Sequence, residues 1–147
     1  MKNIQSIGMV GGGQMGEALI RGMIESGMTS AENITVAEPM ARRREYLETT
    51  YQINGVETAA ELAANSSVII LAVKPQIMQS VLRQYNAHLT VEHLIISIAA
   101  GVTLAQLEQG VGEQRRMRII RVMPNTPALV LAGASAMSGN QHVSKEN

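Results

Sequence analysis

The sequence contains no cysteine, tryptophan or phenylalanine, and it has no excess of charge of either sign, with twelve basic and twelve acidic residues among 147. Without cysteine, disulfides, thiolate catalysis and cysteine–zinc sites are excluded. Without a basic excess, nothing in the charge indicates binding to nucleic acid or to an anionic membrane surface. No apolar run approaches the ~18–20 residues that span a bilayer. The composition therefore predicts a soluble, cytoplasmic protein with no nucleic-acid or membrane partner.

What is present suits one packed domain. The apolar fraction is 46% and the charged fraction 16%, which is ordinary for a globular chain. A domain of this length buries roughly 68–70% of its unfolded surface, enough for one proper core. Residues 1–6 run directly into a strand pattern, so they do not form a signal peptide. We predict a single domain over residues 1–139, followed by a polar tail over 140–147.

Short apolar runs alternate with helical patterns along the chain. The predicted strands are 4–10, 34–37, 68–73, 94–98 and 117–122. Helical patterns follow each of the first four, with Pro75 at the start of one helix and Thr103 as the N-cap of another. This alternation indicates βαβ units. The predicted fold is therefore α/β, a Rossmann-type doubly wound, mostly parallel sheet with helices on both faces.

A glycine-rich turn follows the first predicted strand and matches G-x-G-x-x-G. Gly11 permits a tight turn, Gly13 lets the backbone approach a pyrophosphate, and Gly16 lets the next helix pack closely on the strand. The free N–H groups at the helix start stabilise phosphate charge. The sequence thus predicts a dinucleotide site that includes the whole turn, Gly11, Gly12, Gly13, Gln14, Met15 and Gly16.

Glu38 follows Gly16 by 22 residues, close to the ~20 expected for the acid that reads the adenosine ribose. A carboxylate there accepts both ribose hydroxyls and repels a 2′-phosphate, which favours NADH. Three arginines at 42–44 open the next helix and are able to reach a phosphate, unless they form only a solvated face. The sequence leaves NADH and NADPH open.

Four ordered segments carry a family resemblance. They are residues 11–18, Ala72-Val73-Lys74-Pro75, residues 97–102 and residues 123–128, the last reading Met-Pro-Asn-Thr-Pro-Ala. Together they resemble pyrroline-5-carboxylate reductase, over residues 4 to about 139. The resemblance implies hydride transfer from NADPH or NADH to 1-pyrroline-5-carboxylate, giving L-proline in proline biosynthesis.

The resemblance also implies where the cofactor lies. Ala72, Val73, Lys74 and Pro75 are expected against the adenosine, and Ala99, Ala100, Gly101 and Asn125 at the nicotinamide end. No residue is a convincing catalytic proton donor: His88, His93 and His142 are expected to be surface or structural residues. No metal-site spacing is present.

Two departures from the family stand out. Glu38 is unusual in a family often associated with NADPH. Family members also carry a second, helical domain with the dimer contacts and most of the substrate pocket, so residues 140–147 are expected to begin that missing domain and the full-length protein to be a homo-oligomer. Two alternatives stay open: another Rossmann reductase of the β-hydroxyacid or ketopantoate type, and a non-catalytic nucleotide-binding module.

Overall fold

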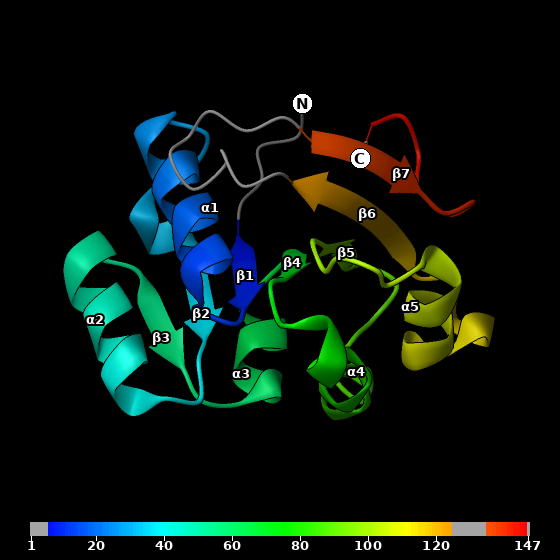
Figure 1. The fold of residues 1–147 in the computed structure, drawn as a ribbon, viewed down its shortest axis with the longest axis horizontal. Helices are drawn as coiled ribbons and strands as arrows, with labels where there is room; N and C mark the ends of the chain where they lie inside the picture. The colour runs from blue at the N-terminus through cyan, green and yellow to red at the C-terminus, as the bar shows by residue number, and fades with distance from the viewer. Residues whose placement is uncertain (1–5, 125–134, 147) are drawn as a thin grey trace.

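The structure, a computed structural model, describes residues 6–124 and 135–146. Its strands form one sheet in the order β3-β2-β1-β4-β5-β6-β7, parallel except for β7, which is antiparallel to β6 (Figure 1). The strands are β1 (Ile7–Val10), β2 (Ile34–Ala37), β3 (Asn54–Val56), β4 (Val68–Leu71), β5 (Leu94–Ser97), β6 (Arg118–Pro124) and β7 (Ser135–Gly139). The helices are α1 (Gln14–Glu25), α2 (Ala41–Tyr51), α3 (Ala59–Ala64), α4 (Met78–Asn86) and α5 (Leu104–Val111), with short 3-10 turns η1 (Ala31–Asn33), η2 (Pro75–Ile77) and η3 (Glu113–Arg115).

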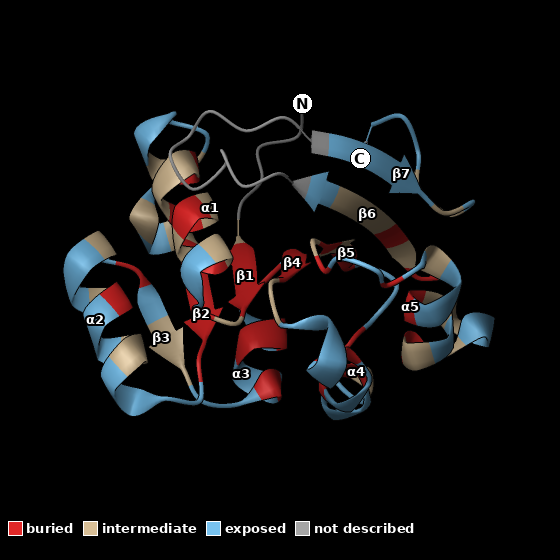
Figure 2. Cartoon of the chain, viewed as in Figure 1, coloured by how far each residue is buried: buried red, intermediate tan, exposed pale blue. Residues whose placement is uncertain are grey.

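The helices cover both faces of the sheet, and two separate apolar cores result. Along β1, Ile7 and Met9 face a core shared with α1 and α2, whereas Val10 faces the core shared with α3, α4 and α5. Successive strand side chains alternate between faces, so one strand serves both cores. The central strands are buried throughout (Figure 2). The predicted Rossmann-type class, with helices on both faces, is confirmed.

Two edge strands were not predicted. β3 has the sequence Asn-Gly-Val and β7 the sequence Ser-Ala-Met-Ser-Gly, neither of which has the β-branched continuity of a central strand. Pairing supplies what propensity lacks: Thr35 of β2 pairs with Asn54 of β3, and Val122 of β6 pairs with Met137 of β7. Tertiary pairing therefore creates both strands.

The predicted end of the fifth strand at Val122 was wrong, because β6 runs on to Pro124. The register between β5 and β6 ends at the pair Ser97 and Arg121. Beyond that point β6 pairs with β7 alone, and proline is tolerated where one side of a strand lacks a ladder partner. Near the end of the chain, residues 145 and 146 form a turn.

The strand order places a ligand crevice at one position. From β1 the chain winds outward through β2 to β3, then returns to the other side of β1 with β4 and winds outward again. In doubly wound sheets, ligands bind beyond the carboxyl ends of the strands where the winding direction reverses. Here that position lies beyond β1 and β4, directly after Val10 and Leu71.

Candidate functional site

The glycine turn leaves β1 at this switch point, and its backbone is tightly packed. Gly11 donates its N–H to the Ala37 carbonyl at 2.9 Å and has a φ of +95°. A Cβ at Gly11 would lie 2.8 Å from the Ala72 oxygen, and one at Gly16 would lie 2.5 Å from the Gly11 oxygen. Both contacts are with backbone atoms, which cannot rotate away. The roles predicted for Gly11 in the turn and for Gly16 in close packing therefore have a geometric basis.

Gly13 differs from its neighbours because nothing lies within 4 Å of the position its Cβ would take. It is the N-cap of α1 and makes no side-chain cap there, so the first N–H groups of the helix have no capping side chain. Gln14 is exposed and Met15 is half-buried. A helix start with open space over its N-cap fits an anionic group such as a pyrophosphate.

Glu38 directly follows β2 and is bonded to the glycine turn. Its side chain is buried, with 8% of the residue exposed. Oε2 accepts a hydrogen bond from the Gly12 N–H at 2.9 Å, and Oε1 accepts one from the Met40 N–H at 3.0 Å. The carboxylate therefore lies beside the glycine turn.

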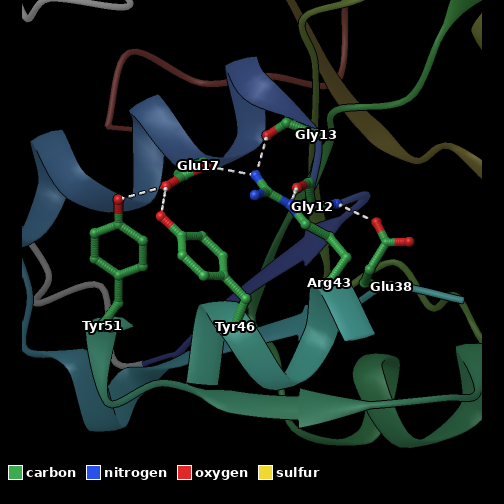
Figure 3. Close-up of polar contacts among 7 residues, drawn as sticks. All are labelled: Gly12, Gly13, Glu17, Glu38, Arg43, Tyr46 and Tyr51. Carbon is green, nitrogen blue, oxygen red and sulfur yellow. Dashed lines mark hydrogen bonds and ion pairs between the residues drawn. The ribbon is translucent and has the colours of Figure 1, made fainter. Parts of the chain in front are cut away.

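The arginines that open α2 are not equivalent. Arg42 is exposed. Arg43 lies over the turn: its Nε donates to the Gly12 carbonyl at 2.6 Å and its guanidinium pairs with Glu17 of α1 (Figure 3). Arg44 donates to the backbone carbonyl of Glu38 at 2.8 Å and pairs with Glu57 at 2.5 Å. The alternative of a purely solvated arginine face thus applies to Arg42 alone.

Glu17 joins α1 to α2 through three donors (Figure 3). Its Oε1 accepts from the Tyr51 hydroxyl at 2.7 Å and from the Tyr46 hydroxyl at 3.0 Å, while Oε2 takes Arg43. Burial by itself would raise the pKa of Glu17, but the hydrogen bonds from Tyr51, Arg43 and Tyr46 hold it below its ordinary value. Burial and the bond to Glu17 raise the pKa of Tyr51 to about 12. The cluster is a carboxylate that three donors hold in its charged form.

The segment predicted to border the adenosine follows β4 and begins beside the glycine turn. Ala72 donates its N–H to the Val10 carbonyl at 2.9 Å, so it lies next to the glycine turn. Val73 Cγ1 is 3.1 Å from the position of a Cβ on Gly11. Lys74 is exposed and is the N-cap of η2, which Pro75 begins. The structure brings Ala72 and Val73 against the turn and leaves Lys74 toward solvent.

The predicted nicotinamide segment follows β5, two strands from β1. Ala99 is buried and donates its N–H to Ser97 Oγ at 3.4 Å. Ala100 is exposed, and Gly101 has a φ of +74° with open space at its Cβ. Asn125, also placed at this end, lies outside the described residues.

Sequence reasoning did not identify the cluster around Glu17. Arg43, Tyr46 and Tyr51 stand at i, i+3 and i+8, which places all three on one side of α2. That spacing of one cation and two hydroxyl donors was the available signal. Their common partner Glu17 was not evident, because it depends on how α1 packs against α2.

The histidines lie away from this site. His93 is buried and forms hydrogen bonds at both ring nitrogens, with the Thr90 N–H at 2.8 Å and the Ala63 carbonyl at 3.1 Å. His88 is exposed and His142 is half-buried. Among residues 6–124 and 135–146, no three His, Asp or Glu side chains gather into a group able to hold a metal. Within the same ranges no helix has the length and apolarity to cross a membrane.

A family model described as "NADP oxidoreductase coenzyme F420-dependent" matches residues 6–101. The chain is 42% identical over 143 residues to the pyrroline-5-carboxylate reductase of Escherichia coli (strain K12), covering 97% of this chain and 52% of that protein. The chain thus spans about half the length of the curated relatives it matches.

Solved structures agree with these sequence matches. A pyrroline-5-carboxylate reductase from Coxiella burnetii superposes with a TM-score of 0.91 at 31% identity, covering 98% of this chain and 53% of that one. The Plasmodium falciparum pyrroline carboxylate reductase, solved with NADP bound, gives a TM-score of 0.84 at 34% identity, with 99% and 52% covered. The resemblance that the four ordered segments indicated is confirmed.

Proposed function

From the premise that this chain belongs to the NADP oxidoreductase, coenzyme F420-dependent family, we propose that it is the dinucleotide-binding part of a pyrroline-5-carboxylate reductase. The proposed reaction transfers a hydride from NADPH or NADH to 1-pyrroline-5-carboxylate, giving L-proline. The observation that carries the proposal is the glycine turn at the switch point of the sheet, closed on one side by Glu38 and open over Gly13. The ordered motifs and the relatives of known name support the choice of substrate.

The residues present fit a dinucleotide. The glycine turn and the first turn of α1, from Gly11 to Gly16, would hold the pyrophosphate through backbone N–H groups. Glu38 would accept hydrogen bonds from the adenosine ribose. The segment from Ala72 to Pro75 would border the adenosine, and Ala99, Ala100, Gly101 and Asn125 the nicotinamide end.

The bound cofactor supplies the hydride, and the protein supplies position and exclusion of water. The chain's own residues bind and orient: backbone N–H groups at the turn hold negative charge, and Glu38 fixes one ribose. We assign no catalytic proton donor within this sequence. We further propose a cytoplasmic location, a small-molecule substrate, and homo-oligomeric assembly of the full-length protein.

The first test is a titration of the 147-residue chain and of its Gly13→Val variant with NADPH and with NADH. Binding is measured by the fluorescence of the reduced nicotinamide. Gly13 has a φ of −68° and a ψ of −171°, which valine also adopts, and its Cβ direction is open, so the variant should fold normally. We expect saturable binding to the parent chain and none to Gly13→Val. The matched control is Ala64→Val. Ala64 is an exposed residue at the end of α3, shortly before the amino end of β4, whereas the glycine turn lies beyond the carboxyl ends of the strands.

Equal binding by the parent chain and Gly13→Val would place the nucleotide elsewhere and refute the proposed site. A second measurement follows oxidation of the reduced nucleotide with 1-pyrroline-5-carboxylate present. We expect little turnover from these 147 residues alone. Full turnover would contradict the view that the substrate pocket comes from a further domain.

A further inference from the structure

We infer that this site prefers NADH to NADPH, because Glu38 lies where the adenosine ribose would bind, while the two arginines beside it, Arg43 and Arg44, are already paired with Glu17 and Glu57. The inference rests on the proposed function and deepens it by selecting between the two cofactors. The family's description names NADP, so a preference for NADH would distinguish this chain from that description. Three observations carry it.

The first observation is the fixed position of the Glu38 carboxylate. Each of its oxygens already accepts one backbone N–H, from Gly12 at 2.9 Å and from Met40 at 3.0 Å. A carboxylate has about four acceptor positions, so both oxygens keep capacity for a ribose hydroxyl. A 2′-phosphate has strong acceptors and negative charge, and it would meet a carboxylate held in place by two backbone bonds. Moving Glu38 aside would leave both N–H groups without that acceptor.

The second observation is that two of the three arginines of α2 are engaged. Arg43 donates to the Gly12 carbonyl at 2.6 Å, pairs with Glu17, and lies 5.1 Å from the centre of the Tyr46 ring. Arg44 is bonded to the Glu38 carbonyl and to Glu57. To bind a phosphate, either arginine would first have to leave a carboxylate. The positive charge predicted from the sequence is therefore largely cancelled before any ligand arrives.

The third observation is that Glu17 is firmly held. Tyr46 and Tyr51 both donate to Oε1, so Oε2 remains directed at Arg43 (Figure 3). These hydrogen bonds keep the pKa of Glu17 low despite its burial, so it stays charged near neutral pH and keeps its hold on Arg43. Glu17 thus acts as a positioning residue for cofactor choice, working through Arg43.

The test is isothermal titration of the full chain with NADH and with NADPH, in one buffer of fixed salt. We expect NADH to bind about tenfold more tightly or better, as one close like-charge contact at the protein surface predicts. Glu38→Gln keeps an acceptor and removes the charge, so it should improve NADPH binding. It should therefore lower the ratio of the NADPH dissociation constant to the NADH dissociation constant. Glu17→Gln should lower this ratio as well, because Arg43 would be released to meet the 2′-phosphate.

The matched control is Glu45→Gln, which removes the same charge from an exposed position on α2. It should leave the ratio within about twofold of the parent, because exposed charges are screened. In the Glu17→Gln background, adding Arg43→Met should cancel the gain in NADPH affinity. A purely structural role for Glu17 would change both affinities alike and would not respond to Arg43.

Several results would overturn the inference. NADPH binding as tightly as NADH to the parent chain would do so, as would equal ratios for Glu38→Gln and Glu45→Gln. An unchanged ratio in Glu17→Gln would refute the role of Arg43. Binding of neither nucleotide by the folded chain would instead refute the proposed function, and the inference with it.

Discussion

Replacing Gly11 by alanine tests whether the glycine turn is stabilised by close backbone packing. In Gly11→Ala the alanine must adopt a φ of +95°. Its Cβ would lie 2.8 Å from the Ala72 carbonyl oxygen and 3.1 Å from Val73 Cγ1. The Ala72 oxygen cannot retreat easily, because the N–H of the same residue is bonded to Val10. The substitution therefore strains the backbone just beyond the carboxyl ends of the neighbouring strands β1 and β4, at the centre of the sheet.

The magnitude follows from three contributions. A left-handed backbone costs a residue with a Cβ ~1–2 kcal/mol. Forcing a methyl group into a packed position costs ~1–3 kcal/mol. Alanine also restricts the unfolded chain, which offsets ~0.4–1 kcal/mol of this cost. We expect a net loss of about 2–4 kcal/mol in the free energy of unfolding, or about 6–12 °C in Tm for a loss near the middle of that range.

The control is Gly13→Ala, two residues along the same turn. Its φ of −68° is ordinary and its Cβ meets nothing within 4 Å, so only N-cap preference changes. We expect a cost below about 1 kcal/mol. Because the chain has no tryptophan, urea unfolding should be followed by far-ultraviolet circular dichroism. Equal destabilisation by the two alanines would refute the reasoning, since both substitutions add the same methyl group.

Two further predictions concern groups outside the turn. His93→Phe should lower the free energy of unfolding in urea by about 2–4 kcal/mol, because it leaves the Thr90 N–H and the Ala63 carbonyl without their partner. The control His88→Phe, at an exposed position, should lower it little. Similar losses for the two variants would contradict this account. Glu17→Gln should cost about 1–2 kcal/mol near neutral pH. The folded-state pKa of Glu17 lies below its ordinary 4.5, so this difference is complete above about pH 4.5 and declines as the pH falls through the folded value. A difference that grows on acidification would have the wrong sign.

Most of the fold was predictable because its central elements carry strong local patterns. The strand predicted over residues 68–73 is β4, and the structure buries all four of its residues, Val68 to Leu71. The helix expected after Pro75 is α4, and its buried side consists of Met78, Val81, Leu82 and Tyr85. Thr103 caps α5 through a reciprocal pair of bonds with Gln106, as its residue type and position suggested.

The edge elements were not predictable in the same way. β3 and β7 contain glycine, asparagine and serine, and they become strands only because β2 and β6 present open edges to them. Edge strands take their order from a partner, so a single-sequence pattern records little of them. The extension of β6 through Pro124 has the same origin.

In the candidate site, too, the sequence predicted the features that depend on neighbouring residues in the chain. The spacing of the glycines and the position of Glu38 were sufficient to predict a dinucleotide turn, because strand, turn and helix follow one another directly in the chain. The four ordered motifs were sufficient to indicate the family. Both kinds of information are local, so the sequence by itself determined the fold class and the kind of ligand.

Only the tertiary structure decided which charges remain to meet that ligand. From the sequence, Arg43 and Glu38 were opposing candidates, and Glu17 was one more residue of a helix. Packing of α2 on α1 brings Arg43 within hydrogen-bonding distance of Glu17, 26 residues away, and turns a cation into half of an ion pair. Electrostatic interactions depend on distance in space, whereas a motif records distance along the chain.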